Sequence, residues 1–366
     1  MSEFLMIILW FVLVAMLYTI APTKQYEMVC GNKVVREKWF SAILLFIPVF
    51  YMVATRSNSI GDTFAYEYLF KQLPNSFGEL IQYIPQVNKD KGFTFLGGII
   101  KILFGNSTVV YFLVLALIQG FSLIYVYRKY STNYLISMFL FIASSDYLSW
   151  MYNGIRQFTA VTIIFAATPL MIKKKWIPLT CIILLASTIH GSALLMIPIV
   201  FIVQGRAWNK KTIFFTLACV VALTFADQFT NILETLLSDT QYTNVVSDWK
   251  GLNDDGTNII RVLVYSIPAI LSFVGRRWID CENDPCINLC TNMSIISAAL
   301  YLVSAGTSGV FLGRLPIFTS LYGYILLPYL LDQMFTRRSA RILKMMMIVA
   351  YLAFYYYQIH FAWGLI

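Results

Sequence analysis

Charged residues are scarce beside the apolar stretches of this sequence, and the few that occur there are chemically selective. A charge near hydrocarbon costs about 2.5–3.5 kcal/mol on insertion scales, so such positions are rarely accidental. The candidates are four arginines, one aspartate and one histidine: Arg56, Asp62, Arg156, His190, Arg261 and Arg314. Arginine presents a planar fork of donors that matches phosphate oxygens at two points, so several arginines suit a diphosphate. His190, with Asp62 as second choice, is the candidate base for an attacking hydroxyl.

Polar neighbours accompany these residues and are predicted to support them. They are Tyr66 one turn after Asp62, Asn153 and Gln157 flanking Arg156, Ser192 after His190, and Tyr322 two turns below Arg314 on the same helix face. No Asp-x-Asp or similar carboxylate pair stands nearby, so neither Mg²⁺ nor another metal or cofactor is expected. The negative charge of a leaving diphosphate is then stabilised by arginine and not by proton donation.

Each residue also has a structural interpretation. A single arginine at a helix start is commonly an interfacial anchor, and Asp62 after Gly61 can cap a helix. His190 can be a satisfied residue in a tight helical hairpin, and Asp146 can pair with Arg156. Together the candidates favour a site, because interfacial anchors normally appear at both membrane faces and include many lysines.

The elements that must position these residues are membrane helices. Of 366 residues, 59% are hydrophobic and 12% are charged, against about 25% charged in an ordinary soluble domain. A spanning helix needs about 20 mostly apolar residues, which predicts an all-α integral membrane protein with about twelve crossings. The predicted spans are 3–22, 39–55, 107–126, 133–150, 156–172, 176–189, 190–204, 212–229, 259–275, 287–306, 314–333 and 342–361.

The stretch 176–203 is long for one helix and short for two. Basic residues flank it on both sides, so the chain is expected to leave and return through two short helices that meet near His190. Across the sequence, 18 of the 27 lysines and arginines fall in alternate short loops, which the positive-inside rule places in the cytoplasm. This clustering between apolar stretches also argues against nucleic acid as the partner of the positive charge.

The same rule places both termini and all six candidate residues on the outer side of the membrane. Two longer outer segments are predicted, 56–106 and 230–258, and amphipathic stretches such as Phe93 to Phe104 are suited to the interface. The sequence shows no internal repeat and no low-complexity linker. We therefore expect one polytopic membrane domain over residues 1–366.

The order of four short motifs resembles the EpsG family of polysaccharide-synthesis membrane proteins, which is related to the Wzy O-antigen and capsule polymerases. The motifs are Arg56 with Gly61-Asp62-Thr63 and Tyr66, then Lys91-Gly92-Phe93, then Asn153-Gly154-Ile155-Arg156-Gln157, then His190-Gly191-Ser192-Ala193-Leu194. The resemblance covers about residues 50–200 well and rests on Arg314 beyond them. One departure from the family pattern Glu-x-Gly-Phe/Tyr is expected, with Lys91 in place of the glutamate.

The resemblance implies a glycosyltransferase-C-like membrane fold and a polymerase of the bacterial plasma membrane that acts on its outer face. It implies transfer of a growing glycan from undecaprenyl diphosphate to the sugar end of another lipid-linked oligosaccharide. Arg156 and Arg314 are assigned to the diphosphate, with Arg56 and Arg261 as further ligands. The outer segment 230–258, with Asp248, is the candidate for recognising the sugar. A chain-length regulator stays open as a partner, as does retaining or inverting stereochemistry.

Three alternatives stay open. A ligase or transferase with a polyprenyl-linked donor makes a single transfer without processive growth. A lipid-linked oligosaccharide flippase or other transporter needs charges along a path that reaches both faces, whereas the predicted cytoplasmic halves of the spans are almost free of charge. An outer-face acyltransferase is poorly supported by His190 without an acidic neighbour.

Overall fold

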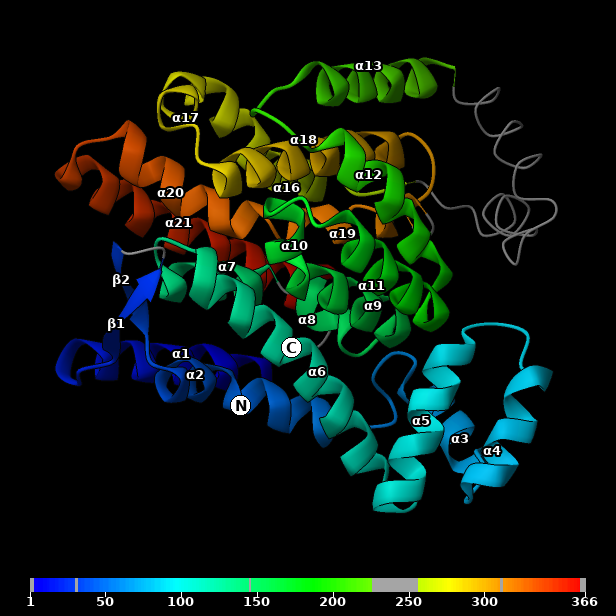
Figure 1. Ribbon diagram of the computed structural model, residues 1–366. Helices are drawn as coiled ribbons and strands as arrows, with labels where there is room; N and C mark the ends of the chain where they lie inside the picture. Colours follow the sequence, from blue (N-terminus) through cyan, green and yellow to red (C-terminus); the bar gives the residue numbers. More distant parts are fainter. Residues whose placement is uncertain (1–2, 30–31, 145, 226–255, 310–311, 363–366) are drawn as a thin grey trace. The chain divides into compact units, whose positions relative to one another are not determined.

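The computed structural model of the protein describes residues 3–29, 32–144, 146–225, 256–309 and 312–362. Two compact units divide the chain, and each is described by itself. The first comprises Met1–Leu194 with Arg341–Ile366, and the second comprises Leu195–Ala340. Both consist predominantly of helices, as Figure 1 shows, and many of these helices are apolar. The predicted outer segment 230–258 lies mostly outside the described residues, and Asp248 with it.

Most helices of the first unit follow the predicted apolar stretches. The helices of this unit are α1 (Glu3–Ile20), α2 (Trp39–Ala54), α3 (Thr63–Gln72), α4 (Phe77–Tyr83), η1 (Ile84–Gln86), α5 (Lys91–Phe104), α6 (Thr108–Tyr130), α7 (Tyr134–Ala143), α8 (Asp146–Trp150), α9 (Ile155–Ala166), α10 (Thr168–Ile172), α11 (Trp176–Ile189), η2 (Gly191–Leu195), most of α21 (Arg337–Tyr357), and η4 (Gln358–Ala362). Of these, α3, α4, η1 and α5 lie within the predicted outer segment 56–106. The Gln358 side chain donates to the Ser144 carbonyl at 2.8 Å, which ties the C-terminal turn to this unit.

Helix α6 is the centre of the first unit and packs against α2 on one side and α9 on another. The buried Gln119 of α6 donates to the Thr159 hydroxyl of α9 at 2.9 Å, so a polar group inside the apolar layer has a partner. Helix α6 runs from a β-hairpin at one end to the helices α3 and α5 at the other (Figure 1). This helix therefore connects two different polar regions of the unit.

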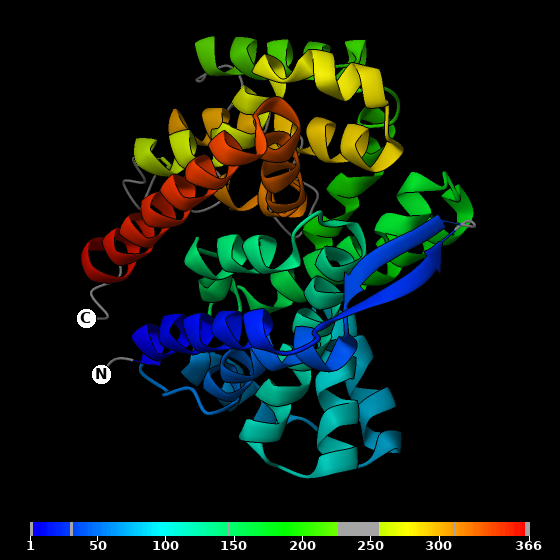
Figure 2. The ribbon, with the colours of Figure 1, turned by 90° about the vertical axis from the view of Figure 1, so that its left-hand side faces the viewer.

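The predicted all-helical class is confirmed, and one short element is added to it, a two-stranded β-hairpin that joins α1 to α2. Strands β1 (Lys24–Val29) and β2 (Asn32–Glu37) pair antiparallel, as the blue arrows in Figure 2 show. The side chain of Arg128, at the end of α6, forms an ion pair with Glu27 and donates to the Glu37 carbonyl. Strands of six residues carry a weak periodic signal beside long apolar helices, and the sequence analysis read them as loop.

The second unit surrounds one deeply buried helix, α18, which packs against α13, α16 and α20. Its elements are α12 (Met196–Ile202), α13 (Lys210–Thr224), α16 (Ile259–Val274), α17 (Arg276–Glu282), α18 (Pro285–Ala305), η3 (Leu312–Arg314), α19 (Ile317–Ser320) and α20 (Gly323–Met334). The Asn292 side chain of α18 accepts from the Trp208 N–H and donates to the Val203 carbonyl. Polar residues within this apolar helix thus fix the loop that precedes α13.

The helices include crossings of bilayer length, and the protein is a membrane protein. Within the described ranges, three helices are long and apolar enough to cross by themselves: α6, α18, and α21 with the turn after it. Two bent pairs raise the number to five if each pair is one crossing. Shorter apolar helices occur at most of the other predicted spans, among them α2, α9 and α11. The number twelve stays a prediction.

Candidate functional site

Arg156 and Asp90 form the centre of a polar cluster in the first unit. Arg156 is the second residue of α9, and its Nη1 donates to Asp90 Oδ2 at 2.8 Å. The arginine side chain is 38% exposed, whereas the aspartate side chain is 9% exposed. The guanidinium carbon also lies 5.8 Å from the centre of the Tyr66 ring. Asp90 therefore holds one edge of the guanidinium and leaves part of the group open to a ligand.

Asp90 links three segments that are distant in sequence. It precedes α5 in a left-handed conformation, with φ of 54°. Besides Arg156, its carboxylate accepts a backbone hydrogen bond from Gly191 at the end of α11. Burial raises the pKa of Asp90 above its ordinary value, although Arg156 and the Gly191 N–H act in the opposite direction. The cluster is therefore built around a buried carboxylate.

The position of this acid corrects the sequence analysis, which placed the glutamate of the Glu-x-Gly-Phe pattern at Lys91. In the four-residue pattern the acid stands two residues before the glycine, and Asp90-Lys91-Gly92-Phe93 fulfils it with a shorter side chain. Asp90 is thus a candidate residue that the sequence analysis missed, and the spacing to Gly92 was the signal. The close packing of Gly92 against Thr188 of α11 fixes the start of α5, because any side chain at Gly92 collides with the Thr188 hydroxyl.

His190 and Ser192 meet Gln157 next to this pair. Helix α11 ends at Ile189, and His190 is extended before η2 begins, so the predicted break at His190 is confirmed. His190 Nδ1 and Ser192 Oγ are 2.7 Å apart, and Gln157 Nε2 donates to the same oxygen at 3.3 Å. Gln157 follows Arg156 on α9. The motif that contains Arg156 and the motif that contains His190 therefore form one continuous group.

Asn153 connects the first outer motif to the same group. Its side-chain oxygen accepts from the Asp62 N–H at 3.1 Å. Gly61 makes this approach possible, because its φ of 53° is left-handed and a side chain there collides with Asn153. The side chain of Asp62 is exposed and forms no capping hydrogen bond to α3, so the capping interpretation is wrong.

Arg56 lies beneath the cluster and not at its surface. It is 7% exposed, its guanidinium carbon lies 3.9 Å from the centre of the Phe112 ring, and its Nε donates to the Val53 carbonyl. Its Nη2 is buried and has no hydrogen-bond partner among the described residues. Burial lowers the pKa of this guanidinium to about 10, which still leaves it charged near neutral pH. Arg56 therefore supplies positive charge from below without direct access from outside.

Arg261 and Arg314 belong to the second unit, at one end of it. Arg261 lies in the first turn of α16. Arg314 is exposed and ends η3, whose Gly313 packs closely on Thr257 just before α16. The predicted span 314–333 is broken, because η3 with α19 meets α20 at an angle of 53°. Tyr322 is buried at the start of α20, so it does not lie two turns below Arg314 on one helix, which corrects that prediction.

A cavity of about 180 Å³ opens beside Arg156 in the first unit. Side chains of α3, α5 and α6 form its walls, and Lys89 and Arg156 bring two positive charges to it. Tyr66 and Tyr111 contribute aromatic surface to the same lining. Lys89 stands in an irregular stretch without a motif, so no sequence signal points to this position.

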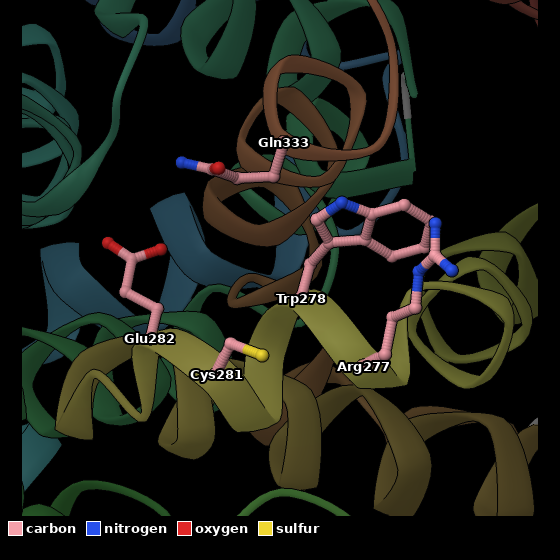
Figure 3. A pocket seen from close by; sticks show the side chains of 5 residues that line it. All are labelled: Arg277, Trp278, Cys281, Glu282 and Gln333. Atoms are coloured by element: carbon pink, nitrogen blue, oxygen red, sulfur yellow. The ribbon is translucent and has the colours of Figure 1, made fainter.

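A wider hollow of about 610 Å³ in the second unit is separate from these residues. Figure 3 shows its lining, with Arg277, Trp278, Cys281 and Glu282 on α17 and Gln333 on α20. The hollow adjoins the C-terminal end of α16. Arg261 lies in the first turn of the same helix, about 24 Å away along its axis. The guanidinium carbon of Arg277 lies 3.9 Å from the Trp278 ring centre. No predicted diphosphate ligand lines this hollow.

Comparison with known sequences adds one finding. A sequence profile described as the EpsG family matches residues 39–363, which is most of the chain. Neither a curated protein nor a solved structure matches the sequence. The match includes both units and every residue of the polar cluster.

Proposed function

Because the chain belongs to the EpsG family of polysaccharide-biosynthesis proteins, we propose that it is a Wzy-type polymerase of the bacterial plasma membrane. It moves a growing glycan from undecaprenyl diphosphate to the sugar end of another lipid-linked repeat unit. The proposal includes a site on the outer face and a glycosyltransferase-C-like fold with about twelve crossings. The observation that carries it is the partly exposed Arg156 held by the buried Asp90, with His190 and Ser192 beside them.

Arg156 is the first ligand of the diphosphate. Its guanidinium is oriented by Asp90 on one side, and its remaining donors match two phosphate oxygens. Arg56 lies buried nearby without a carboxylate among its described partners, and it adds positive potential. Arg261 and Arg314 stay predictions as further ligands. The arrangement supplies the electrostatic stabilisation that a departing lipid diphosphate requires.

The transfer forms a bond between the acceptor hydroxyl oxygen and C1 of the donor sugar, while the bond from C1 to the diphosphate oxygen breaks. The hydroxyl proton goes to His190, with Asp62 as second choice, and the electron pair leaves with undecaprenyl diphosphate. Ser192, whose oxygen accepts from Gln157, orients the imidazole through Nδ1. Direct displacement with one base inverts the configuration at C1.

The test uses the purified protein with undecaprenyl diphosphate-linked repeat units of the source organism, without nucleotide sugar or added metal. We expect a ladder of products on a gel. Arg156→Ala and His190→Ala should abolish the ladder, whereas Arg277→Ala, which changes an exposed arginine of the other hollow, should preserve it. A single shifted product indicates a single-transfer enzyme, and lipid movement across a vesicle without product indicates a transporter. A full ladder from Arg156→Ala refutes the proposed site.

A further inference from the structure

The cavity beside Arg156 has two chemically different ends. Lys89 precedes Asp90 in the chain and Arg156 binds Asp90, so both positive charges lie at the start of α5. Gly97 lines the cavity two turns further along α5, about 10 Å away, and packs near Leu73. Among the described residues that line the cavity, none carries a carboxylate. The cavity thus has a cationic end and an apolar end.

The wall of the cavity continues into an exposed apolar surface. Leu69 of α3 lines the cavity and is itself 54% exposed. Its neighbours on the same helix, Phe64 and Tyr68, are also more than half exposed, as is Leu103 on α5. Exposed apolar faces on short helices are typical of segments that lie in the membrane interface. An apolar chain can therefore enter the cavity from the lipid past Leu69.

The size of the cavity decides how much of a ligand it takes. Sites that enclose a whole small molecule measure about 300–1,000 Å³, whereas this cavity measures about 180 Å³. It accepts one part of a larger molecule. The side chains of Leu69, Phe70, Leu73 and Phe93 offer no hydrogen-bond partner, so burying sugar hydroxyls against them is costly. The hydroxyl groups in the lining belong to Thr94 and to the tyrosines Tyr66, Tyr83 and Tyr111. An apolar group attached to an anion satisfies both ends.

We propose that this cavity binds the isoprene unit next to the diphosphate of a polyprenyl diphosphate. The chain enters from the bilayer past Leu69, and Lys89 and Arg156 bind the diphosphate at the start of α5. The choice of a polyprenyl lipid as ligand rests on the proposed function. The cavity adds to that function the point at which the lipid, and not the sugar, is recognised.

The test measures binding to the full-length protein in detergent, with geranylgeranyl diphosphate as the probe and inorganic pyrophosphate as the comparison. Leu69→Trp places an indole across the exposed opening without disturbing buried packing. We expect it to weaken binding of the prenyl diphosphate about tenfold, a loss typical of a blocked apolar contact, and to leave pyrophosphate binding unchanged. The matched control is Leu103→Trp, an exposed leucine of α5 outside the cavity, which should bind as the natural protein does.

A second variant reaches the cavity from inside. Gly97→Val directs methyl groups into its apolar end, where a Cβ lies 3.0 Å from Leu73 Cδ1. It should weaken the same probe, whereas Arg156→Ala should weaken both probes. Equal affinity for the two probes, or no effect of Leu69→Trp, overturns the proposal. The proposal is also overturned if Leu69→Trp weakens the binding of a water-soluble repeat-unit oligosaccharide and not that of the prenyl diphosphate. Selective prenyl binding without any product ladder refutes the polymerase and leaves the cavity assignment standing.

Discussion

Two arginine–carboxylate pairs at opposite ends of α6 differ in which partner is buried. At the hairpin end, Arg128 is 6% exposed and Glu27 is 31% exposed. At the other end, Arg156 is 38% exposed and Asp90 is 9% exposed. The acid is therefore the more exposed partner at the hairpin end, and the arginine is the more exposed partner at the other end.

The contacts of the two arginines explain this difference. Arg128 donates to the Glu37 carbonyl and stacks over Trp39 at 4.6 Å, so its donors hold the hairpin to α6. Arg156 is held from behind by a carboxylate that also joins α5 to the end of α11. An arginine buried over an exposed acid is a structural link. An arginine exposed over a buried acid is suited to bind an anion.

The largest expected effect comes from replacing each arginine with lysine. Arg156→Lys keeps the charge but loses the planar fork, so we expect the ladder-forming rate to fall about 100-fold, as when one donor to a developing anion is removed. Arg128→Lys should leave the rate per folded protein within twofold and cost about 1–3 kcal/mol of stability. The rate is measured on the gel assay, and stability by thermal unfolding in detergent. Equal losses of rate in both variants contradict the comparison.

Replacing the buried acid should have the next largest effect. Asp90→Asn keeps the size of the side chain but removes the charge that orients Arg156, so we expect a 10- to 100-fold loss of polymerase rate, about the range for a misplaced catalytic group. Asp90→Glu, which matches the family pattern, should restore most of it. A positioning role predicts a changed KM or kcat at unchanged thermal stability. A loss explained wholly by unfolding assigns Asp90 to structure alone.

The two acids should also respond differently to pH. Burial raises the pKa of Asp90, so the folded protein takes up this proton more readily than the unfolded chain. As the pH falls through the raised pKa of Asp90, protonation of this carboxyl favours the folded protein over the unfolded chain. The same protonation removes the ion pair between Asp90 and Arg156. The hydrogen bond from Arg128 lowers the pKa of Glu27. The stability that ionised Glu27 contributes to the folded protein is therefore lost only at still lower pH, as the pH falls through this lowered pKa.

We therefore expect polymerase activity to decline on acidification before the protein unfolds. The measurement compares a pH–rate profile with thermal unfolding at each pH. Because the proposed base His190 must also be unprotonated, some decline should remain in Asp90→Asn, but the part of the decline that belongs to Asp90 should be lost. A profile unchanged from that of the natural protein assigns the titration to another group.

Much of the fold follows from the apolar stretches, because a segment of bilayer length can hardly be anything but a helix. The predicted spans match α2, α6, α11 and α18 within a few residues. The hairpin was missed, since two strands of six residues leave only a short periodic pattern. The break between Arg314 and α20 was also missed, although Pro316 and Gly323 mark it.

The proximity of two motifs was predictable from their order, whereas the roles of their residues stay predictions. Gln157 of one motif meets Ser192 and His190 of the other. Asp90 was missed because the pattern was placed one residue too late. The burial of an arginine depends on which rings lie over it, and nothing near Arg56 in the sequence reveals the Phe112 ring. Only tertiary packing distinguishes the buried Arg56 from the partly exposed Arg156.

The smallest expected effect is that of Glu27→Gln at the hairpin. The change removes the charge from an acid that is 31% exposed, while Arg128 keeps its bond to the Glu37 carbonyl and its stacking over Trp39. A partly exposed ion pair contributes about 0.2–1 kcal/mol, so the melting temperature should fall by at most about 2 °C. Product length and rate should be unchanged. A change of more than twofold in either makes the hairpin end functional and removes the distinction between the two arginines.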